Sequence, residues 1–227
     1  MLVNVTLTSA DRRLDLSGAQ AVDNVLGSQQ VCGGAVSYTH LDVYKRQVEH
    51  YLVHVMRSHE DFLPELDLVI ELDHQVIGNI MYTKARLVDE AGTEKNILTF
   101  GPVSILPEYQ RKGYGKKLIE HSFQEAAALG YDVIVIFGNP GNYVSRGFKS
   151  CKKYNVCIEN GTYPAAMLVK ELKPEALDGR KWIYHDSPVF QVDEQQAERF
   201  DERLEKLEKK CQPSQEEFYI LSQSVLQ

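Results

Sequence analysis

The sequence has few cysteines and no long apolar run, and these shortages exclude several classes of protein. The four cysteines form neither a CxxC pair nor a dense framework, so a disulfide scaffold is excluded. No apolar stretch approaches the roughly 18 residues that cross a membrane, and the first residues lack the pattern of a signal peptide. We therefore expect a cytoplasmic protein with reduced thiols and no membrane partner.

Positive charge is also scarce. The chain holds 25 Lys and Arg against 32 Asp and Glu, a net charge of −7, so we expect no nucleic-acid partner. Apolar residues make up 43% and charged residues 25%, which is typical of a globular protein and excludes a collagen-like or disordered chain. A length of 227 residues fits one large domain, or one domain with an appendage.

Three zones of the chain differ in character. Residues 1–47 show weak periodicity, and we interpret them as an N-terminal segment of uncertain origin. Residues 48–172 alternate strand and helix patterns and form the predicted core. Residues 173–227 are predicted to be a C-terminal extension with a charged helix over 193–210, docked on the domain or on a second subunit, and a frayed end after Cys211.

Within the core, periodicity predicts a mixed α/β sheet. Residues 66–72 alternate apolar and acidic side chains, so we expect a half-buried strand there. Gly101-Pro102 interrupts another strand, and proline cannot donate to a ladder, so a bulge or splay is expected at that point. The other predicted elements are helices over 48–59 and 114–129 and strands over 76–82, 96–105 and 132–137.

A glycine-containing turn precedes the predicted helix 114–129. Residues 106–118 read LPEYQRKGYGKKL, with Gly113 and Gly115 at the start of the helix and basic residues on both sides. The first amides of a helix have no internal partner, and glycines let an anion approach them, so the turn predicts a diphosphate cradle. The alternative is a helix start with a solvated basic face. A Walker A motif is absent, and Leu118 stands where the dinucleotide fingerprint needs its third glycine or alanine.

Two motifs resemble the signatures of the GCN5-related N-acetyltransferase (GNAT) family. Residues 110–115 (QRKGYG) are similar to its Q/R-x-x-G-x-G/A motif, and Tyr143 precedes a Gly-Phe pair by four residues, as in its second signature. Residues 100–107 (FGPVSILP) are similar to the bulged strand that leads into the cradle. The resemblance covers residues 48–172 and extends more weakly to Val192, where it points to the bacterial predicted-acetyltransferase branch.

The resemblance implies the GNAT acyl-CoA N-acyltransferase fold, a mostly antiparallel mixed sheet splayed at the cofactor site. It implies direct transfer of an acetyl group from acetyl-CoA, without a metal, to a primary amine of an unknown small-molecule or peptide acceptor. A main-chain N–H near Val103 would polarise the thioester carbonyl. The implied cofactor-binding residues are Val103, Ser104, Ile105, Gln110, Arg111, Lys112, Gly113, Tyr114, Gly115 and Asn139.

Tyr143 matches the position of the family's general acid, since a phenol with a pKa of about 10 can protonate a departing thiolate. The alternative is a buried aromatic residue beside Phe148. The general base stays unassigned, because the glutamate of some relatives has no counterpart in residues 133–136 (VIVI). Glu71 acting through water is one substitute, although a carboxylate on such a strand is usually solvated.

Other candidate groups fit packing or solvent exposure better than chemistry. His50 and His54 have zinc-ligand spacing, with His59 nearby, but no further ligand is evident and histidines on a polar helix face are common. Cys151 and Cys157 are interpreted as small packing groups.

The N-terminal zone does not show the strand and helix with which a GNAT chain should begin. Residues 36–47 resemble translated adaptor sequence, and our hypothesis is a chimeric join near Gln47-Val48. The alternative is a divergent first strand and helix, with residues 14–26 as the helix.

Two rival functions remain at this stage. One is a GNAT-like sensor or interaction module that binds acyl-CoA without turnover. The other is a nucleotide-binding enzyme, which would prefer NAD or ATP to coenzyme A. The acetyltransferase interpretation leads, with a homodimer among its expected forms.

Overall fold

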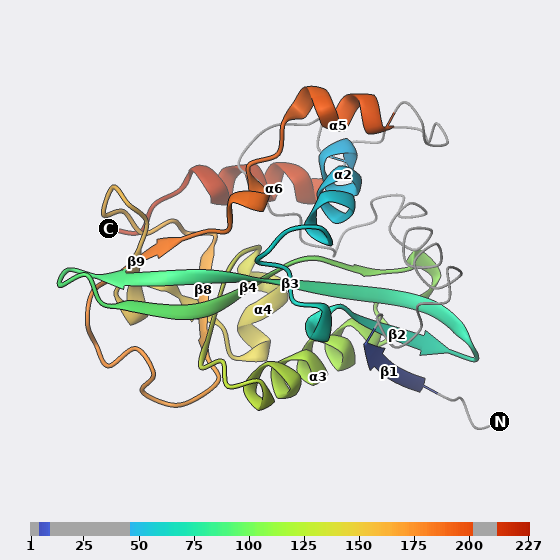
Figure 1. Cartoon of the computed structure of the whole chain (residues 1–227), viewed down its shortest axis with the longest axis horizontal. Coiled ribbons are helices and arrows are strands. Elements are labelled where there is room, and N and C mark those ends of the chain that lie inside the picture. The colour runs from blue at the N-terminus through green and yellow to red at the C-terminus, as the bar shows by residue number, and fades with distance from the viewer. Residues whose placement is uncertain (1–4, 10–45, 202–212) are drawn as a thin grey trace.

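Alternating apolar residues build one mixed sheet, and helices cover both of its faces (Figure 1). The computed structural model describes residues 5–9, 46–201 and 213–227. The strands are β1 (Val5–Ser9), β2 (Leu68–Leu72), β3 (Gln75–Asp89), β4 (Glu94–Ile105), β5 (Val133–Phe137), β6 (Lys149–Ser150), β7 (Val156–Cys157), β8 (Met167–Glu171) and β9 (Trp182–His185). The helices are α2 (Arg46–Met56), α3 (Tyr114–Ala128), α4 (Pro140–Tyr143), α5 (Glu194–Asp201) and α6 (Pro213–Gln223), with 3-10 turns η2 (Pro64–Leu66), η3 (Pro107–Tyr109), η4 (Val144–Arg146), η5 (Cys151–Tyr154) and η6 (Pro188–Phe190).

The strand order is β1-β2-β3-β4-β5-β8-β6, and β9 pairs with both β3 and β7. The β4–β5 and β7–β9 pairs are parallel and the remaining pairs are antiparallel, so the predicted mixed and mostly antiparallel sheet is confirmed. Strand β9 comes from the C-terminal zone, which therefore contributes to the same sheet as the core.

Strand β2 is buried on both faces, so the expectation of a half-buried strand is wrong. Asp67 is only 5% exposed and Glu71 only 2%. The physical reason is that β1 and β3 pair with both edges of β2, while α2 and α3 cover its two faces. Asp67 is compensated in this setting, because its carboxylate accepts hydrogen bonds from Asn79 Nδ2 at 2.8 Å and Arg57 Nε at 3.3 Å.

The predicted bulge in β4 is confirmed. Tyr82 pairs with Phe100 and Ile80 pairs with Val103, so Gly101 and Pro102 together lie opposite a single residue of β3. Proline lacks the N–H that a regular ladder would use, which favours the irregularity at this point.

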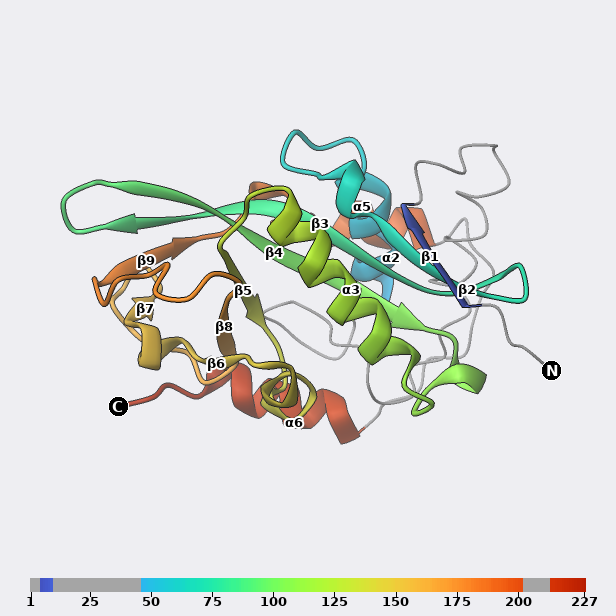
Figure 2. The same ribbon diagram turned by 90° about the horizontal axis from the view of Figure 1, so that it is seen from below.

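Beyond the bulge, β4 stays paired with β3 but separates from β5. The β3–β4 register continues to Ile105, whereas the β4–β5 register consists of the single pair Leu98–Ile134 (Figure 2). The second half of β4 therefore turns one edge of its main chain away from the sheet, and the predicted splay is present.

Helix α3 matches its prediction closely. Gly113, with φ of 89°, precedes it, and Gly130, with φ of 90°, follows it. Its buried face contains Leu118, Ile119, Phe123 and Ala126. Ala127 was expected on that face but is exposed, because the 3.6-residue period carries it past the edge of the sheet.

The C-terminal end is ordered by main-chain contacts, so the prediction of a frayed end is wrong. Helix α6 is followed by a segment in which Leu226 N donates to Tyr163 O, and Ala165 N donates to Ser224 O, each at 2.8 Å. Of the helix expected over 193–210, α5 confirms the part up to Asp201, and the remainder lies outside the described residues. None of the helices in the described ranges is long and apolar enough to span a bilayer.

The N-terminal zone supplies a strand. Residues Val5–Ser9 form β1, which pairs antiparallel with β2, and α2 starts at Arg46, just before the proposed join. The helix expected over 14–26 and residues 36–45 of the suspected adaptor lie outside the described residues. A chimeric origin therefore stays a prediction.

One buried hydrogen bond ties α3 to the sheet and predicts an asymmetric pair of mutations. Ser122 Oγ donates to Ile119 O at 2.8 Å, so the Tyr82 hydroxyl donates in its 2.8 Å bond to Ser122 Oγ. Tyr82→Phe removes a donor and should lower the free energy of unfolding by about 1 kcal/mol, whereas Ser122→Ala leaves the buried Tyr82 hydroxyl without an acceptor and should cost about 2 kcal/mol. Urea denaturation of both variants measures the order, and an equal or reversed order would contradict this assignment.

Candidate active site

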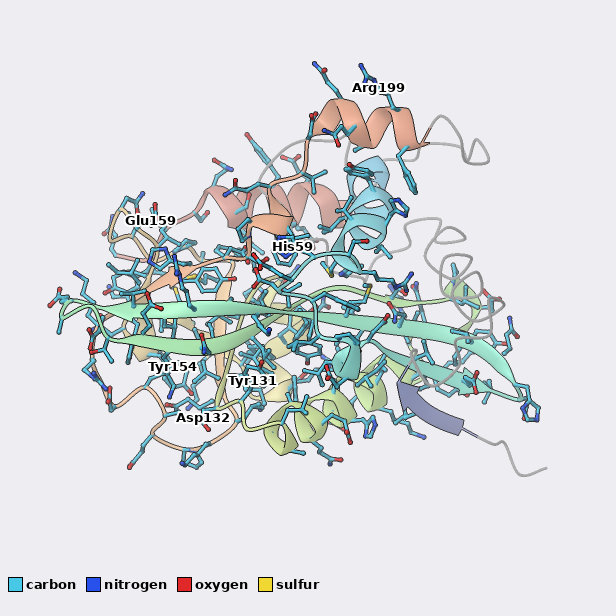
Figure 3. The ribbon with its side chains drawn as sticks, in the orientation of Figure 1. His59, Tyr131, Asp132, Tyr154, Glu159 and Arg199 are labelled. Carbon is cyan, nitrogen blue, oxygen red and sulfur yellow. The ribbon has the colours of Figure 1, made fainter. Side chains whose placement is uncertain are left out.

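The two faces of the sheet carry different side chains where β4 separates from β5. On the face covered by α3, here called the α3 face, Phe100 packs in one core cluster with residues of α3 and α4. On the opposite face, here called the α2 face, Val69 and Met81 pack against α2. Figure 1 shows α3 on one side of β3 and β4 and α2 and α5 on the other. Figure 3 shows His59 on the α2 side, with Tyr131 and Asp132 on the α3 side.

The predicted cradle lies at the start of α3, directly after β4. Residues 110–113 form a turn in which Arg111 has φ of 57° and Gly113 has φ of 89°. A Cβ on Gly113 would meet no atom within 4 Å, so the space beside its Cα is open. Helix α3 has no acidic residue in its first turn. The N-terminal amides and the positive end of the helix dipole therefore lie at an exposed turn without a competing carboxylate, which favours the binding of an anion.

The side chains of the cradle serve mainly to shape it. Gln110 Nε2 donates to Ile105 O at 2.9 Å and ties the turn to the end of β4. Tyr114 contacts Tyr109 edge to face, and Lys112 lies over the Tyr109 ring. A Cβ on Gly115 would lie 3.4 Å from Ile105, so this glycine allows the first turn of the helix to approach the strand. The structure thus brings together the residues predicted over 103–115.

The second half of β4 is held close to β3 by a glycine. A Cβ on Gly78 would lie 2.6 Å from Ser104 O and 2.4 Å from Ile105 Cδ1, so no larger residue fits there without a shift. The side chains of Val103 and Ile105 belong to the α3-face core. Ser104 is buried, and its hydroxyl has no hydrogen-bond partner among the described residues.

Tyr143 packs on β4 from the α3 face. Its ring lies 5.8 Å from Phe100 and 5.6 Å from Phe148, and the residue is 1% exposed. Burial raises the pKa of the Tyr143 phenol above its ordinary value, and the charge of Arg146 opposes this shift. No described residue accepts a hydrogen bond from its hydroxyl. The phenol therefore stays protonated at neutral pH and keeps its proton available for a ligand.

Asn139 caps α4 instead of facing an open space. Its Oδ1 accepts a hydrogen bond from Gly141 N at 2.9 Å, and Pro140 occupies the first position of the helix. This is the usual role of asparagine before a short helix. Asn139 lies at the end of β5, and in this structure its side chain acts first to orient the turn that carries Tyr143.

The turn after Tyr143 depends on a lysine that sequence reasoning missed. Lys170 Nζ donates to Arg146 O at 2.9 Å and lies 4.9 Å from the centre of the Phe123 ring. A Cβ on Gly147 would come within 2.8 Å of this ammonium group, so the glycine of the Gly-Phe pair makes room for Lys170. No local pattern in the sequence marks Lys170, because its partners lie far away in the chain.

The remaining candidate residues have structural contacts. Burial raises the pKa of the Cys151 thiol to about 12 and also raises that of Cys157, so neither is an activated nucleophile. His54 stacks on Phe200, and His59 lies 3.6 Å from Asp61. Within the described ranges, no group of three metal-ligating side chains converges.

Known sequences similar to this chain are acetyltransferases. The model of the acetyltransferase (GNAT) family matches residues 37–149. The uncharacterized N-acetyltransferase YhbS of Escherichia coli is 28% identical over 147 residues, which cover 63% of this chain and 84% of YhbS. The uncharacterized N-acetyltransferase YjhQ of the same organism is 28% identical over 101 residues, 44% of this chain and 55% of YjhQ.

Solved structures show the same fold. The crystal structure of YhbS in complex with CoA superimposes with a TM-score of 0.61 at 22% identity, covering 84% of this chain and 92% of that one. A GNAT family acetyltransferase from Brucella melitensis in complex with acetyl-CoA gives a TM-score of 0.56 at 21% identity, covering 82% and 98%. The separated β4 and β5, the cradle and the family match agree, and the chain belongs to the GNAT family of acetyltransferases.

Proposed function

We propose that this protein transfers the acetyl group of acetyl-CoA to a primary amine, directly and without a covalent enzyme intermediate. One observation carries the proposal: a main-chain edge, an anion cradle and a buried phenol converge where β4 separates from β5. The comparisons add that YhbS and the Brucella melitensis enzyme were crystallised with CoA and acetyl-CoA.

The residues present fit this substrate. The diphosphate would bind the amides of 111–115, where the Cβ position of Gly113 is open and the helix dipole is positive. Arg111 and Lys112 are exposed beside it and supply positive charge. The pantetheine arm would pair with the main-chain edge of Val103, Ser104 and Ile105 that faces away from β3, where β5 has separated. When bound, acetyl-CoA supplies an activated acyl group and a thiolate leaving group.

The chain supplies electrostatic stabilisation and a proton. A main-chain N–H near Val103 would bind the carbonyl oxygen as negative charge develops on it. Tyr143 would give its proton to the departing thiolate, and its raised pKa ensures that the phenol carries this proton at neutral pH. Asn139 and Lys170 would position Tyr143 by fixing the two ends of its turn.

The proposal extends to the acceptor, the cellular location and the partners of the protein. We propose an amine acceptor of small-molecule or peptide type and a cytoplasmic location in a bacterial cell. The named relatives from Escherichia coli and the net charge of −7 support this setting. A homodimer and the absence of a nucleic-acid or membrane partner belong to the same proposal.

Two matched glycine variants test the cradle. Gly113 and Gly130 flank α3 with nearly the same φ, and the Cβ positions of both are open. An alanine at either position should cost about 1–2 kcal/mol of unfolding free energy, because both adopt the left-handed conformation. Only Gly113→Ala should weaken acetyl-CoA binding, by roughly tenfold or more, or about 1.4 kcal/mol. Calorimetric titration measures the affinities, and equal affinities of the two variants would place the diphosphate elsewhere.

Tyr143→Phe tests the general acid. The phenol hydroxyl has no partner in the described residues, so the variant should fold normally and bind acetyl-CoA as the wild type does. Its kcat should fall about 100-fold or more, in line with loss of general acid catalysis. Tyr154→Phe on η5 is the control and should keep full activity. A parallel loss of acetyl-CoA affinity and kcat in Tyr143→Phe would show that Tyr143 is structural.

Release of free CoA thiol from acetyl-CoA, followed with a panel of primary amines, tests the function itself. Turnover with at least one amine is expected. Tight acetyl-CoA binding without turnover of any amine would instead support a sensor or interaction module.

A further inference from the structure

The α2 face of the separated strands is spanned by one tyrosine from the C-terminal zone. Tyr184 on β9 lies beside Leu87 of β3, and its ring lies 5.9 Å from that of Phe137 at the end of β5. Tyr184 packs in one cluster with Leu87 of β3, Ile97 of β4 and Val135 of β5, and so lies on the face opposite Tyr143, next to the strands that separate.

The Tyr184 hydroxyl is bound to a carboxylate. Tyr184 donates to Asp186 Oδ1 at 2.9 Å, and the main-chain N–H of Ser187 donates to the same oxygen at 2.9 Å. Within the described residues, Asp186 Oδ2 accepts no hydrogen bond. One carboxylate oxygen is therefore fixed, and the other is available as a base.

Asp186 can be reached by a ligand and still differs from an ordinary surface carboxylate. The residue is exposed. The chain packed around its carboxyl displaces water and raises the pKa of Asp186 to about 6, while the hydrogen bonds from Tyr184 and Ser187 oppose this rise. A carboxylate with this pKa is ionised at pH 7 and accepts a proton more readily than one with a pKa near 4.

We infer that Asp186 is the general base of the acetyl transfer, with Tyr184 as its positioning residue; this rests on the proposed function. The general base had no assigned residue in the sequence analysis. Asp186 lies outside residues 37–149, the part of the chain that the family model matches. The acid and the base then lie on opposite faces of the sheet. The amine approaches from the α2 face, and the thiolate departs beside Tyr143 on the α3 face.

The proton balance of this scheme closes. Asp186 Oδ2, directly or across one water, takes a proton from the ammonium form of the acceptor and later releases it to solvent. The neutral nitrogen attacks the thioester carbon, a C–N bond forms and the C–S bond breaks. The thiolate receives its proton from Tyr143, whose phenolate then takes a proton from solvent. The second proton lost by the nitrogen passes to Asp186 or to water on the α2 face and leaves to solvent. The products are the N-acetyl amide and free CoA thiol.

Two further titratable residues, Asp61 and His59, are connected to Asp186 through Ser187. The Ser187 hydroxyl donates to Asp61 Oδ2 at 2.7 Å, and Asp61 lies 3.6 Å from His59 Nδ1. Ser187 and His59 both lie against Oδ2 of Asp61. In contrast, Oδ2 of Asp186 accepts no hydrogen bond from the described residues, so Asp186 is the better candidate for a base.

The test measures kcat/KM against pH from 5 to 9 with acetyl-CoA and two kinds of acceptor. Lysine, putrescine and ethanolamine are protonated at pH 7, and hydroxylamine is neutral. Asp186→Asn keeps an acceptor for Tyr184 and Ser187 but loses the base. This variant should lower kcat/KM for the protonated amines about 100-fold at pH 7 and affect hydroxylamine far less. In the pH profile of kcat/KM, the fall in rate below about pH 6 should disappear.

Two further variants separate positioning from structure. Tyr184→Phe keeps the contact with Phe137 but loses the bond that lowers the pKa of Asp186, so its acid limb should move to higher pH. Asp73→Asn, in the exposed turn between β2 and β3, is the control, since asparagine tolerates its φ of 48°. It should match the wild type throughout.

The outcomes separate the two claims. An active wild type with an unchanged Asp186→Asn profile overturns the base assignment alone, whereas a wild type without turnover overturns the proposed function and this inference with it. A readout independent of activity is the carbon-13 carboxyl titration of wild type minus Asp186→Asn by NMR. A pKa of about 6 is expected, and an ordinary value of about 3.9 would contradict the site described here.

Discussion

The separation of β4 from β5 is the constraint on which the rest of the structure depends. A parallel pair that stops after Leu98 and Ile134 leaves one edge of β4 without a strand, and buried main-chain groups need partners. The bulge at Gly101-Pro102 and the close approach at Gly78 keep that half of β4 attached to β3 alone. A ligand with amide groups of its own can therefore complete the ladder that the protein leaves open.

The surrounding elements divide the chemistry between two faces of the sheet. On the α3 face, the cradle offers amides and a positive dipole, and Tyr143 is held among aromatic rings that keep it protonated. On the α2 face, β9 presents Tyr184 and Asp186 beside the two separated strands. Strand alternation provides this division between two faces without any change of backbone direction.

Much of this site follows from local sequence, because its key signals are backbone signals. Gly101-Pro102 predicted the bulge and Gly113 predicted the helix start, since each residue type restricts its own backbone. Burial was predicted less well. Glu71 and Asp67 were expected on a solvated face, and only the neighbouring strands and helices decide that they are buried. Lys170 gave no signal, because its partners Phe123 and Arg146 are distant in sequence. Asp186 gave none either, because its position depends on Tyr184, whose ring meets Phe137 only after folding.

Hydrogen–deuterium exchange of the full chain, with and without acetyl-CoA, tests the central claim most directly. The account predicts slowed exchange at the amides of residues 101–105 and 111–115, with little change at the far end of the β3–β4 hairpin. Protection confined to other segments, or none at saturating acetyl-CoA, would contradict a substrate bound between the separated strands.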